Sequence, residues 1–302
     1  MTDFLMVPDL GETGLVEVLE TAASVKADPD ASRGRLVGKN VGLFFEKPST
    51  RTRVSAEVAC VDLGAHPVVL KQDEVGLGRR EAVADVARVL DRYLDVLAFR
   101  VFRHVDLEAV ARHADAPVIN LLSDRSHPCQ GIADLQTIAE NRPLPGTTVT
   151  YVGDGNNVAH SLLLGGAMVG MHVRVASPEG YDPDHEIVEE ASRIAAATGG
   201  SITVDPGVMS LVSGADVVYT DVWASMGQEA EAQRRAERFA PYRVDEALFA
   251  EAADDAIFLH CLPAHRGEEV TDGVVDHERS RVFDQAENRM HSFKALLLFL
   301  AG

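Results

Sequence analysis

Short apolar runs rich in β-branched residues alternate along this chain with polar segments of helical pattern. Within those segments apolar residues recur at helical spacing, as in Val54, Val58 and Val61. Such alternation predicts parallel β-sheets with helices on both faces, because parallel strands need long crossover connections. The predicted strands are residues 41–45, 66–70, 95–99, 117–121, 148–152, 172–176, 201–204, 216–220 and 256–260.

The chain of 302 residues is long enough for two domains of ordinary size. Two prolines and a glycine within residues 140–146 separate one helical segment from the next strand. We therefore expect an α/β fold of two doubly wound parallel-sheet domains joined by helices, at residues 1–140 and 141–281. A C-terminal helix over 282–302 is expected to pack back on the first domain.

The acidic composition narrows the classes of partner. The formal net charge is −19, and only five lysines stand against 23 arginines. Such a surface repels nucleic acid and anionic lipid. No apolar run approaches the ~20 residues that span a bilayer, and the first residues lack the basic region of a secretory signal. We expect a cytoplasmic protein that binds neither nucleic acid nor membrane.

The cysteines and histidines form no metal or disulfide pattern. Cys60, Cys129 and Cys261 are odd in number and widely spaced. No HExxH motif or Cys/His cluster occurs among the 11 histidines, so we expect no structural metal. Cys261 could also be a catalytic thiol nucleophile, but no cysteine-hydrolase motif surrounds it, so covalent catalysis is a weak hypothesis.

Unusual polar segments follow six of the predicted strands. Ligands of open α/β sheets bind beyond the carboxyl ends of the strands, so these segments are candidates for a functional site. They comprise residues 47–53, Arg100, 127–130, 154–157, 221–223 and 260–263.

The segment 47–53 carries two arginines and three hydroxyls where a strand is followed by a helix. Pro48 suits the first turn of a helix, and the N–H groups and positive dipole end there attract phosphate. Arginine adds planar forks that match phosphate oxygens. An ordinary capped helix is the alternative, but the interleaving of Arg51 and Arg53 with threonines favours an anion site.

Residues 153–155, Gly-Asp-Gly, begin like a dinucleotide-binding fingerprint, but Val158 stands in place of the third glycine. A nicotinamide-dependent oxidoreductase is therefore a weak alternative. Asn156 and Asn157 either cap the next helix or offer a donor and an acceptor to an amino-acid α-carbon.

Other polar residues also have two interpretations. His127 and Gln130 either satisfy the hydrogen bonds of a turn or belong to a functional site. Arg100 is harder to explain as purely structural, because an arginine is rarely buried without an anion or polar partner. Asp221 and Ser225 suit an ammonium and a carboxylate group, although an Asx-type loop is the better explanation of these two residues taken alone.

Together these segments resemble the aspartate/ornithine carbamoyltransferase family, and its ornithine branch in particular. Residues 49–53 look like the carbamoyl-phosphate motif of that family, and residues 127–130, His-Pro-Cys-Gln, resemble its second element. Residues 221–227, Asp-Val-Trp-Ala-Ser-Met-Gly, look like the ornithine-specific loop. Residues 260–263, His-Cys-Leu-Pro, are similar to a signature that the aspartate branch lacks. The resemblance covers nearly the whole chain.

The resemblance implies transfer of a carbamoyl group from carbamoyl phosphate to the δ-amine of L-ornithine, giving L-citrulline and phosphate in arginine biosynthesis. Residues 1–140 are then expected to bind carbamoyl phosphate, and residues 141–281 to bind ornithine. The implied carbamoyl-phosphate residues are Ser49, Thr50, Arg51, Thr52, Arg100, His127, Gln130, Cys261, Leu262 and Arg289. The implied ornithine residues are Asn157, Asp221, Ser225 and Met226.

Four of these residues, Thr52, Arg100, His127 and Cys261, are implied to act in catalysis. By resemblance, the first three polarise the carbamoyl oxygen and Cys261 lies beside the reacting amine. Gln130 and the carbonyl of Leu262 are implied to accept hydrogen bonds from the carbamoyl amide.

The resemblance also implies a homotrimer or a multiple of trimers, with no metal or organic cofactor. One position departs from the family pattern, because Gly76 stands where a glutamine usually reaches the phosphate of a neighbouring subunit. A related carbamoyltransferase with another amine acceptor therefore stays open. A non-catalytic anion-binding protein is disfavoured, because it has no need of His127, Gln130 and Asp221 at strand ends.

Overall fold

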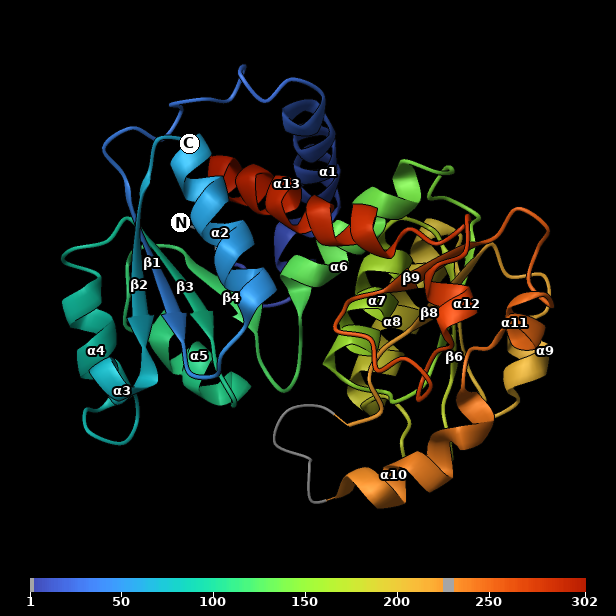
Figure 1. Cartoon of the computed structure of the whole chain (residues 1–302). Helices are drawn as coiled ribbons and strands as arrows, with labels where there is room; N and C mark the ends of the chain where they lie inside the picture. The colour runs from blue at the N-terminus through green and yellow to red at the C-terminus, as the bar shows by residue number, and fades with distance from the viewer. Residues whose placement is uncertain (1–2, 225–230) are drawn as a thin grey trace. The chain divides into compact units, whose positions relative to one another are not determined.

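The computed structural model describes residues 3–224 and 231–302 (Figure 1). The chain forms two compact units, which comprise Met1–Gln136 with Glu287–Gly302, and Thr137–Ala286. Helix α6 (Pro128–Ala139) begins in the first unit and ends in the second, whereas α13 (Val282–Ala301) begins in the second unit and ends in the first. The two units are therefore joined through helices, as the sequence predicts.

The first unit contains a four-stranded parallel sheet in the order β2-β1-β3-β4. Its strands are β1 (Asn40–Phe45), β2 (His66–Lys71), β3 (Val96–Arg100) and β4 (Val118–Leu122). Its other helices are η1 (Val7–Leu10), α1 (Gly11–Ala27), α2 (Thr50–Asp62), α3 (Gln72–Val75), α4 (Val83–Leu90) and α5 (His104–Ala111). The strand order reverses between β1 and β3, which is where open α/β sheets bind ligands.

The second unit contains a five-stranded parallel sheet in the order β7-β6-β5-β8-β9. Its strands are β5 (Thr148–Val152), β6 (His172–Ala176), β7 (Ser201–Val204), β8 (Val217–Thr220) and β9 (Ile257–His260). Its other helices are α7 (Asn157–Met168), α8 (His185–Thr198), α9 (Val208–Val212), α10 (Ala232–Phe239), η3 (Ala240–Tyr242), α11 (Glu246–Phe249) and α12 (Asp272–Val275). The corresponding reversal of strand order lies between β5 and β8.

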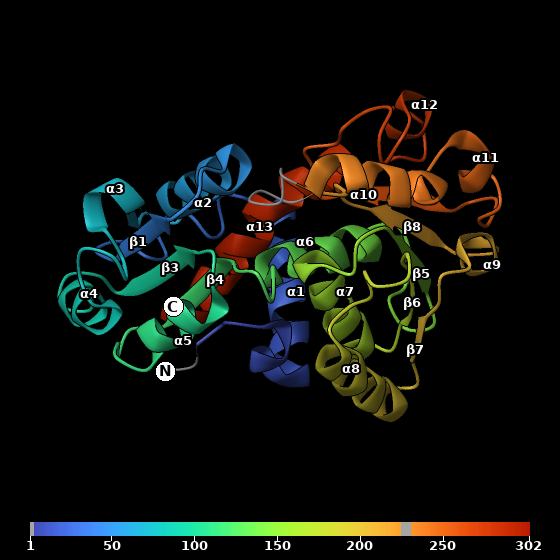
Figure 2. The ribbon, with the colours of Figure 1, turned by 90° about the horizontal axis from the view of Figure 1, so that it is seen from below.

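Each sheet is covered by helices on both faces. In the first unit, Phe44 and Phe99 of the sheet pack with Val86 of α4 and Leu107 of α5, and α2 lies on the opposite face (Figure 2). In the second unit, helices α9, α11 and α12 share one apolar core with the sheet, while α7 and α8 lie on the other face (Figure 2). The predicted fold class is thus confirmed, and every strand begins within one residue of its predicted start.

The buried face of helix α2 is not the face on which its regularly spaced valines lie. Val54, Val58 and Val61 are 53%, 39% and 62% exposed, although their spacing is helical. Smaller side chains, including Ala56 and Ala59, face the sheet instead. Small residues let the helix backbone approach the strands closely, which leaves a row of three valines on the outside.

None of the helices among residues 3–224 and 231–302 combines the length and apolar character needed to cross a membrane.

Candidate active site

The first turn of α2 gathers hydroxyl groups at the carboxyl end of β1. Ser49 is the N-cap residue: its Oγ accepts a hydrogen bond from the N–H of Thr52 at 3.4 Å and donates to Thr52 Oγ1 at 2.9 Å. Arg289 from α13 donates through Nη2 to the same Thr52 oxygen at 2.7 Å. The positive end of the helix dipole thus lies beside a buried guanidinium, and both attract an anion.

Arg100 lies next to this turn because of strand register. As the last residue of β3, it pairs with Phe45 at the end of β1, and it is only 6% exposed. Arg53, which the sequence pattern groups with Arg51, instead makes an exposed ion pair with Glu57 at 2.7 Å. The structure therefore brings Arg100 beside the end of β1 and directs Arg53 elsewhere.

The cationic side chains around the start of α2 come from several elements and repel one another. Burial and the neighbouring charge of Arg100 lower the pKa of Lys47 from 10.5 to about 8. Burial, with the charges of Arg289, Arg100 and Lys47, lowers the pKa of His127 well below its ordinary 6.5. A group of like charges that suppresses further protonation is a site suited to a dianion, because the dianion relieves the repulsion. The imidazole of His127 is neutral at pH 7 and can donate one hydrogen bond.

Gln130 presents an oriented amide near the start of α6. Its Nε2 donates to Asp134 Oδ1 at 2.8 Å, one helical turn later, and both side chains are fully buried. Within the described part of the chain, Gln130 Oε1 has no hydrogen-bond donor. A buried acceptor without a donor is costly, so this oxygen is suited to an N–H group of a ligand.

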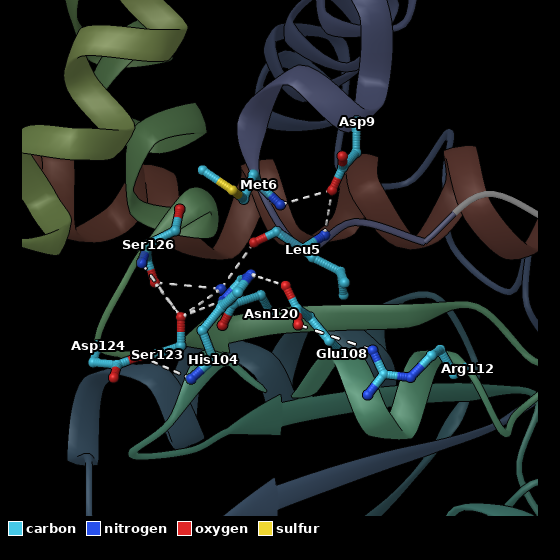
Figure 3. Close-up of polar contacts among 10 residues, drawn as sticks. All are labelled: Leu5, Met6, Asp9, His104, Glu108, Arg112, Asn120, Ser123, Asp124 and Ser126. Atoms are coloured by element: carbon cyan, nitrogen blue, oxygen red, sulfur yellow. Dashed lines mark hydrogen bonds and ion pairs between the residues drawn. The ribbon is translucent and has the colours of Figure 1, made fainter. Parts of the chain in front are cut away.

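A buried polar network supports the turn that leads into His127 (Figure 3). Asn120 Nδ2 donates to Ser123 Oγ at 3.2 Å and to the carbonyl of Ser126 at 3.3 Å, and the N–H of Ser126 donates to Ser123 Oγ at 3.3 Å. His104 Nδ1 lies 2.8 Å from the same Ser123 oxygen. Burial lowers the pKa of His104, so its ring is neutral at pH 7, and the Ser123 hydroxyl also donates to the carbonyl of Ser126 at 3.3 Å. The network fixes the backbone immediately before His127.

In the second unit, Asp221 is held by donors from two neighbouring strand ends. Asn156, which caps α7, donates through Nδ2 to Asp221 Oδ2 at 3.0 Å. Cys261, which follows β9, donates through Sγ to Asp221 Oδ1 at 2.9 Å. Both carboxylate oxygens are thereby oriented, and each keeps capacity to accept from a ligand ammonium. Asn157 begins α7 beside this group.

The contact with Asp221 bears on the thiol-nucleophile alternative. A thiol that donates its proton to a carboxylate is not the thiolate that covalent catalysis needs. Leu262 follows Cys261 in the left-handed region, with φ 56°. The remaining predicted ornithine residues, Ser225 and Met226, lie outside the described residues.

The glycines of the 153–155 segment have structural reasons that require no dinucleotide. Gly153 has φ 140°, which side chains rarely adopt. A Cβ on Gly155 would lie 2.2 Å from the backbone nitrogen of Pro183. Close backbone approach therefore accounts for the motif, and Val158 is buried in the start of α7. These contacts weaken the nicotinamide hypothesis further.

Gly76 is also explained by local geometry. It closes α3 with φ 69°, and a Cβ there would lie 2.5 Å from Cβ of Arg80. The turn is therefore shaped for glycine, and this loop has no glutamine side chain at that position to offer to another subunit.

A buried ion pair that the sequence did not indicate lies at the end of β5. Arg235 on α10 donates through Nη1 to Asp154 Oδ2 at 2.8 Å and to the carbonyl of Trp223 at 2.9 Å. Its guanidinium also lies 4.9 Å from the ring centroid of Tyr181. Burial raises the pKa of Asp154 from 3.8 to about 6, although the charge of Arg235 opposes the rise.

This pKa predicts a specific pH dependence of stability. Between about pH 4 and pH 6 the folded chain keeps a proton on Asp154 that the unfolded chain has lost, so stability falls as the pH rises through 6. We expect the free energy of unfolding, relative to an Asp154→Asn variant, to fall by about 3 kcal/mol across this window. Denaturant titrations at successive pH values measure this difference, and a difference independent of pH contradicts the prediction.

The structure thus defines an α/β protein with a cationic set of side chains in one unit and a carboxylate-centred set in the other. Residues 2–140 match the family described as "Aspartate/ornithine carbamoyltransferase, carbamoyl-P binding domain", and residues 145–300 match its "Asp/Orn binding domain". The chain belongs to the aspartate/ornithine carbamoyltransferase family.

Similar proteins extend over nearly the full length. A protein named ornithine carbamoyltransferase from Parafrankia sp. is 51% identical, over 98% of this chain and 95% of its own. Another of that name, from Acidothermus cellulolyticus, is 53% identical, over 98% of this chain and 96% of its own. The solved structure of ornithine carbamoyltransferase from Pyrococcus furiosus is 49% identical, with a TM-score of 0.96, covering 100% of this chain and 97% of that one. The family resemblance predicted from the motifs is confirmed.

Proposed function

We propose that the protein transfers the carbamoyl group of carbamoyl phosphate to the δ-amine of L-ornithine, with L-citrulline and phosphate as products. The observation that carries the proposal is the cluster of cations beside the first turn of α2, where burial and the charges of Arg289, Arg100 and Lys47 lower the pKa of His127. The cluster suits a dianionic phosphate ester, and the oriented carboxylate of Asp221 suits the ammonium of an amino acid. Ornithine as acceptor follows from the names of the relatives and from the intact 221–227 motif.

The phosphate group is assigned to the start of α2. Ser49, Thr50, Arg51 and Thr52 offer hydroxyls, backbone N–H groups and a guanidinium to its oxygens. Arg289, which already donates to Thr52 Oγ1 at 2.7 Å, fixes that hydroxyl and adds positive charge.

The carbamoyl group is assigned to the donors beside this turn. Thr52, Arg100 and neutral His127 polarise its oxygen, and they stabilise the oxyanion that forms when the amine attacks the carbonyl carbon. Gln130 Oε1 accepts from the carbamoyl amide, which supplies the donor that this oxygen lacks within the described residues. The carbonyl of Leu262 is the second proposed acceptor.

The amine must lose its positive charge before it attacks. An alkylamine has a pKa near ~10.4, and the cations of the phosphate site disfavour its ammonium form. Asp221, Asn157, Ser225 and Met226 are proposed to hold the α-amino and α-carboxyl groups, with Cys261 beside the δ-amine. The new C–N bond forms first, and the C–O bond to phosphate breaks when the tetrahedral oxyanion collapses. The departing phosphate takes the amine proton, so no separate base is needed.

We further propose a homotrimer, or a multiple of trimers, working in the cytoplasm in arginine biosynthesis. The exposed row of Val54, Val58 and Val61 on α2 supports an interface with another copy of the chain, because burial of such a row on association is favourable. The three cysteines, all within the described residues, form no disulfide with one another, which supports a reducing compartment.

A parallel assay of carbamoylated products tests the function. Purified protein with carbamoyl phosphate is offered L-ornithine, putrescine, L-lysine or N-acetyl-L-ornithine at equal concentration. Citrulline from ornithine, at a rate well above any other product, is the expected result. A preferred product from another amine would replace ornithine as acceptor, for which the altered turn at Gly76 leaves room. No product from any amine would overturn the proposed reaction.

A further inference from the structure

The loop that follows β9 is held by a fully buried histidine and glutamate. His260, the last residue of β9, and Glu269 are both 0% exposed, and His260 Nε2 lies 3.1 Å from Glu269 Oε1. The N–H of Leu262 donates to His260 Nδ1 at 2.9 Å. The N–H of His265 donates to Glu269 Oε1 at 2.6 Å. Two backbone positions of one loop are thus attached to one side-chain pair.

These contacts determine the protonation of the ring. A backbone N–H can only donate, so Nδ1 of His260 accepts from Leu262 and carries no proton. The ring proton is therefore on Nε2 and is donated to Glu269. Because both ring nitrogens are engaged inside the protein, His260 is a supporting group rather than a proton donor or metal ligand beside Cys261.

The loop between these attachments contains residues that the proposed function assigns to the substrates. Leu262 adopts φ 56°, which is unusual for a leucine, and its N–H is held in that conformation by the imidazole. Cys261, one residue earlier, is held between His260 and Asp221, to which its thiol donates at 2.9 Å. The direction of the Leu262 carbonyl follows from the same fixed backbone.

We propose that His260 and Glu269 form a positioning pair, in which the glutamate fixes the imidazole and the imidazole fixes the backbone of Leu262 and the thiol of Cys261. The inference rests on the proposed function for its kinetic consequences. The contacts themselves also predict an effect on the environment of Cys261, which is measurable without turnover.

Two substitutions of His260 distinguish the role of ring atom Nδ1 from that of Nε2. In His260→Asn the side-chain oxygen can take the place of Nδ1 and accept from Leu262, whereas in His260→Gln the polar end reaches toward Glu269 and that acceptor is lost. We expect His260→Gln to lose about 100-fold in kcat, as small misplacement of reacting groups does. We expect His260→Asn to recover most of that loss. Glu269→Gln should lie between them, because a neutral amide holds the ring less firmly than a carboxylate.

Alkylation by iodoacetamide gives the second measurement. Cys60 and Cys129 are buried, and burial raises the pKa of each thiol to about 12, so labelling reports on the partly exposed Cys261. The labelling rate should rise in His260→Gln and stay near the wild-type rate in His260→Asn. If His260→Gln does not fold, Glu269→Gln is compared with the wild type instead.

The kcat values and labelling rates together decide whether His260 and Glu269 act as a positioning pair. A wild-type protein that forms no carbamoylated amine defeats the proposed function, and the labelling rates still test the pair. Equal losses of kcat in the Asn and Gln variants, with equal labelling rates, would show a role in folding alone and overturn the inference. Wild-type kcat and labelling in every variant would overturn it as well.

Discussion

Arg100→Ala is expected to lower kcat by at least about 100-fold, or ~2.7 kcal/mol of transition-state stabilisation. Arg100 is buried at the end of β3, in register with the end of β1, and its charge reaches both Lys47 and His127. A donor in that position contributes most when negative charge develops on the carbamoyl oxygen, so its loss should appear in kcat more than in KM. Citrulline formation at saturating concentrations of both substrates measures the effect.

Two further substitutions make the result specific. Arg100→Lys keeps the charge but not the planar fork, and it should retain an intermediate rate. Arg112→Ala is the matched control, because Arg112 follows α5 with its side chain 64% exposed, 3.9 Å from Glu108. The control should stay within about 0.5 kcal/mol of the wild type in stability and keep its turnover. Turnover of Arg100→Ala close to that of the wild type would remove Arg100 from the proposed mechanism.

Arg235→Ala is expected to destabilise the folded protein by about 3–5 kcal/mol near pH 8. The substitution leaves the carboxylate of Asp154 buried without its 2.8 Å partner and removes the contact to the carbonyl of Trp223. Because the pKa of Asp154 is already about 6, removal of Arg235 should raise it further and let the carboxyl take a proton. The loss of stability should therefore shrink as the pH falls from 8 toward about 6, and it should change little below 6, where Asp154 carries a proton in both proteins.

Denaturant unfolding at two pH values measures this effect. Arg238→Ala, on the exposed side of the same helix α10, is the matched control and should cost little. A double variant, Arg235→Met with Asp154→Leu, should recover much of the lost stability, because burying two apolar groups avoids desolvating two charges. If Arg235→Ala unfolds like Arg238→Ala at pH 8, the ion pair has no such role.

The sheets and the positions of their polar ends were predictable from the sequence. Strands such as 41–45 and 148–152 are short, apolar and β-branched, and parallel packing demands that their carboxyl ends share an edge. That argument places Arg100 at the same sheet edge as the 47–53 turn, and Asp221 at the same edge as Asn156, whereas the strand order that makes them neighbours comes from the structure. Their roles toward substrates stay predictions.

The direction of individual side chains was not predictable in the same way. The row of Val54, Val58 and Val61 has the spacing of a core face, yet smaller residues occupy that face of α2. Arg235 lies in a mostly polar segment, which by its sequence alone predicts a solvent-exposed helix. Only the tertiary fold places its side chain against Asp154. Likewise, nothing in residues 260–263 indicates a partner at Glu269. These contacts join different elements or distant positions in a loop, which periodicity does not encode.

The ammonium of Lys47 is expected to couple binding of the proposed dianion to proton uptake. Its pKa of about 8 means that a substantial fraction of free protein molecules carry a neutral amine there in mildly alkaline solution. A dianion bound nearby favours the charged form, so the pKa rises on binding and those molecules draw a proton from the buffer. By thermodynamic reciprocity, affinity for the dianion must weaken as the pH rises above about 8. The heat of binding must then depend on the ionisation enthalpy of the buffer.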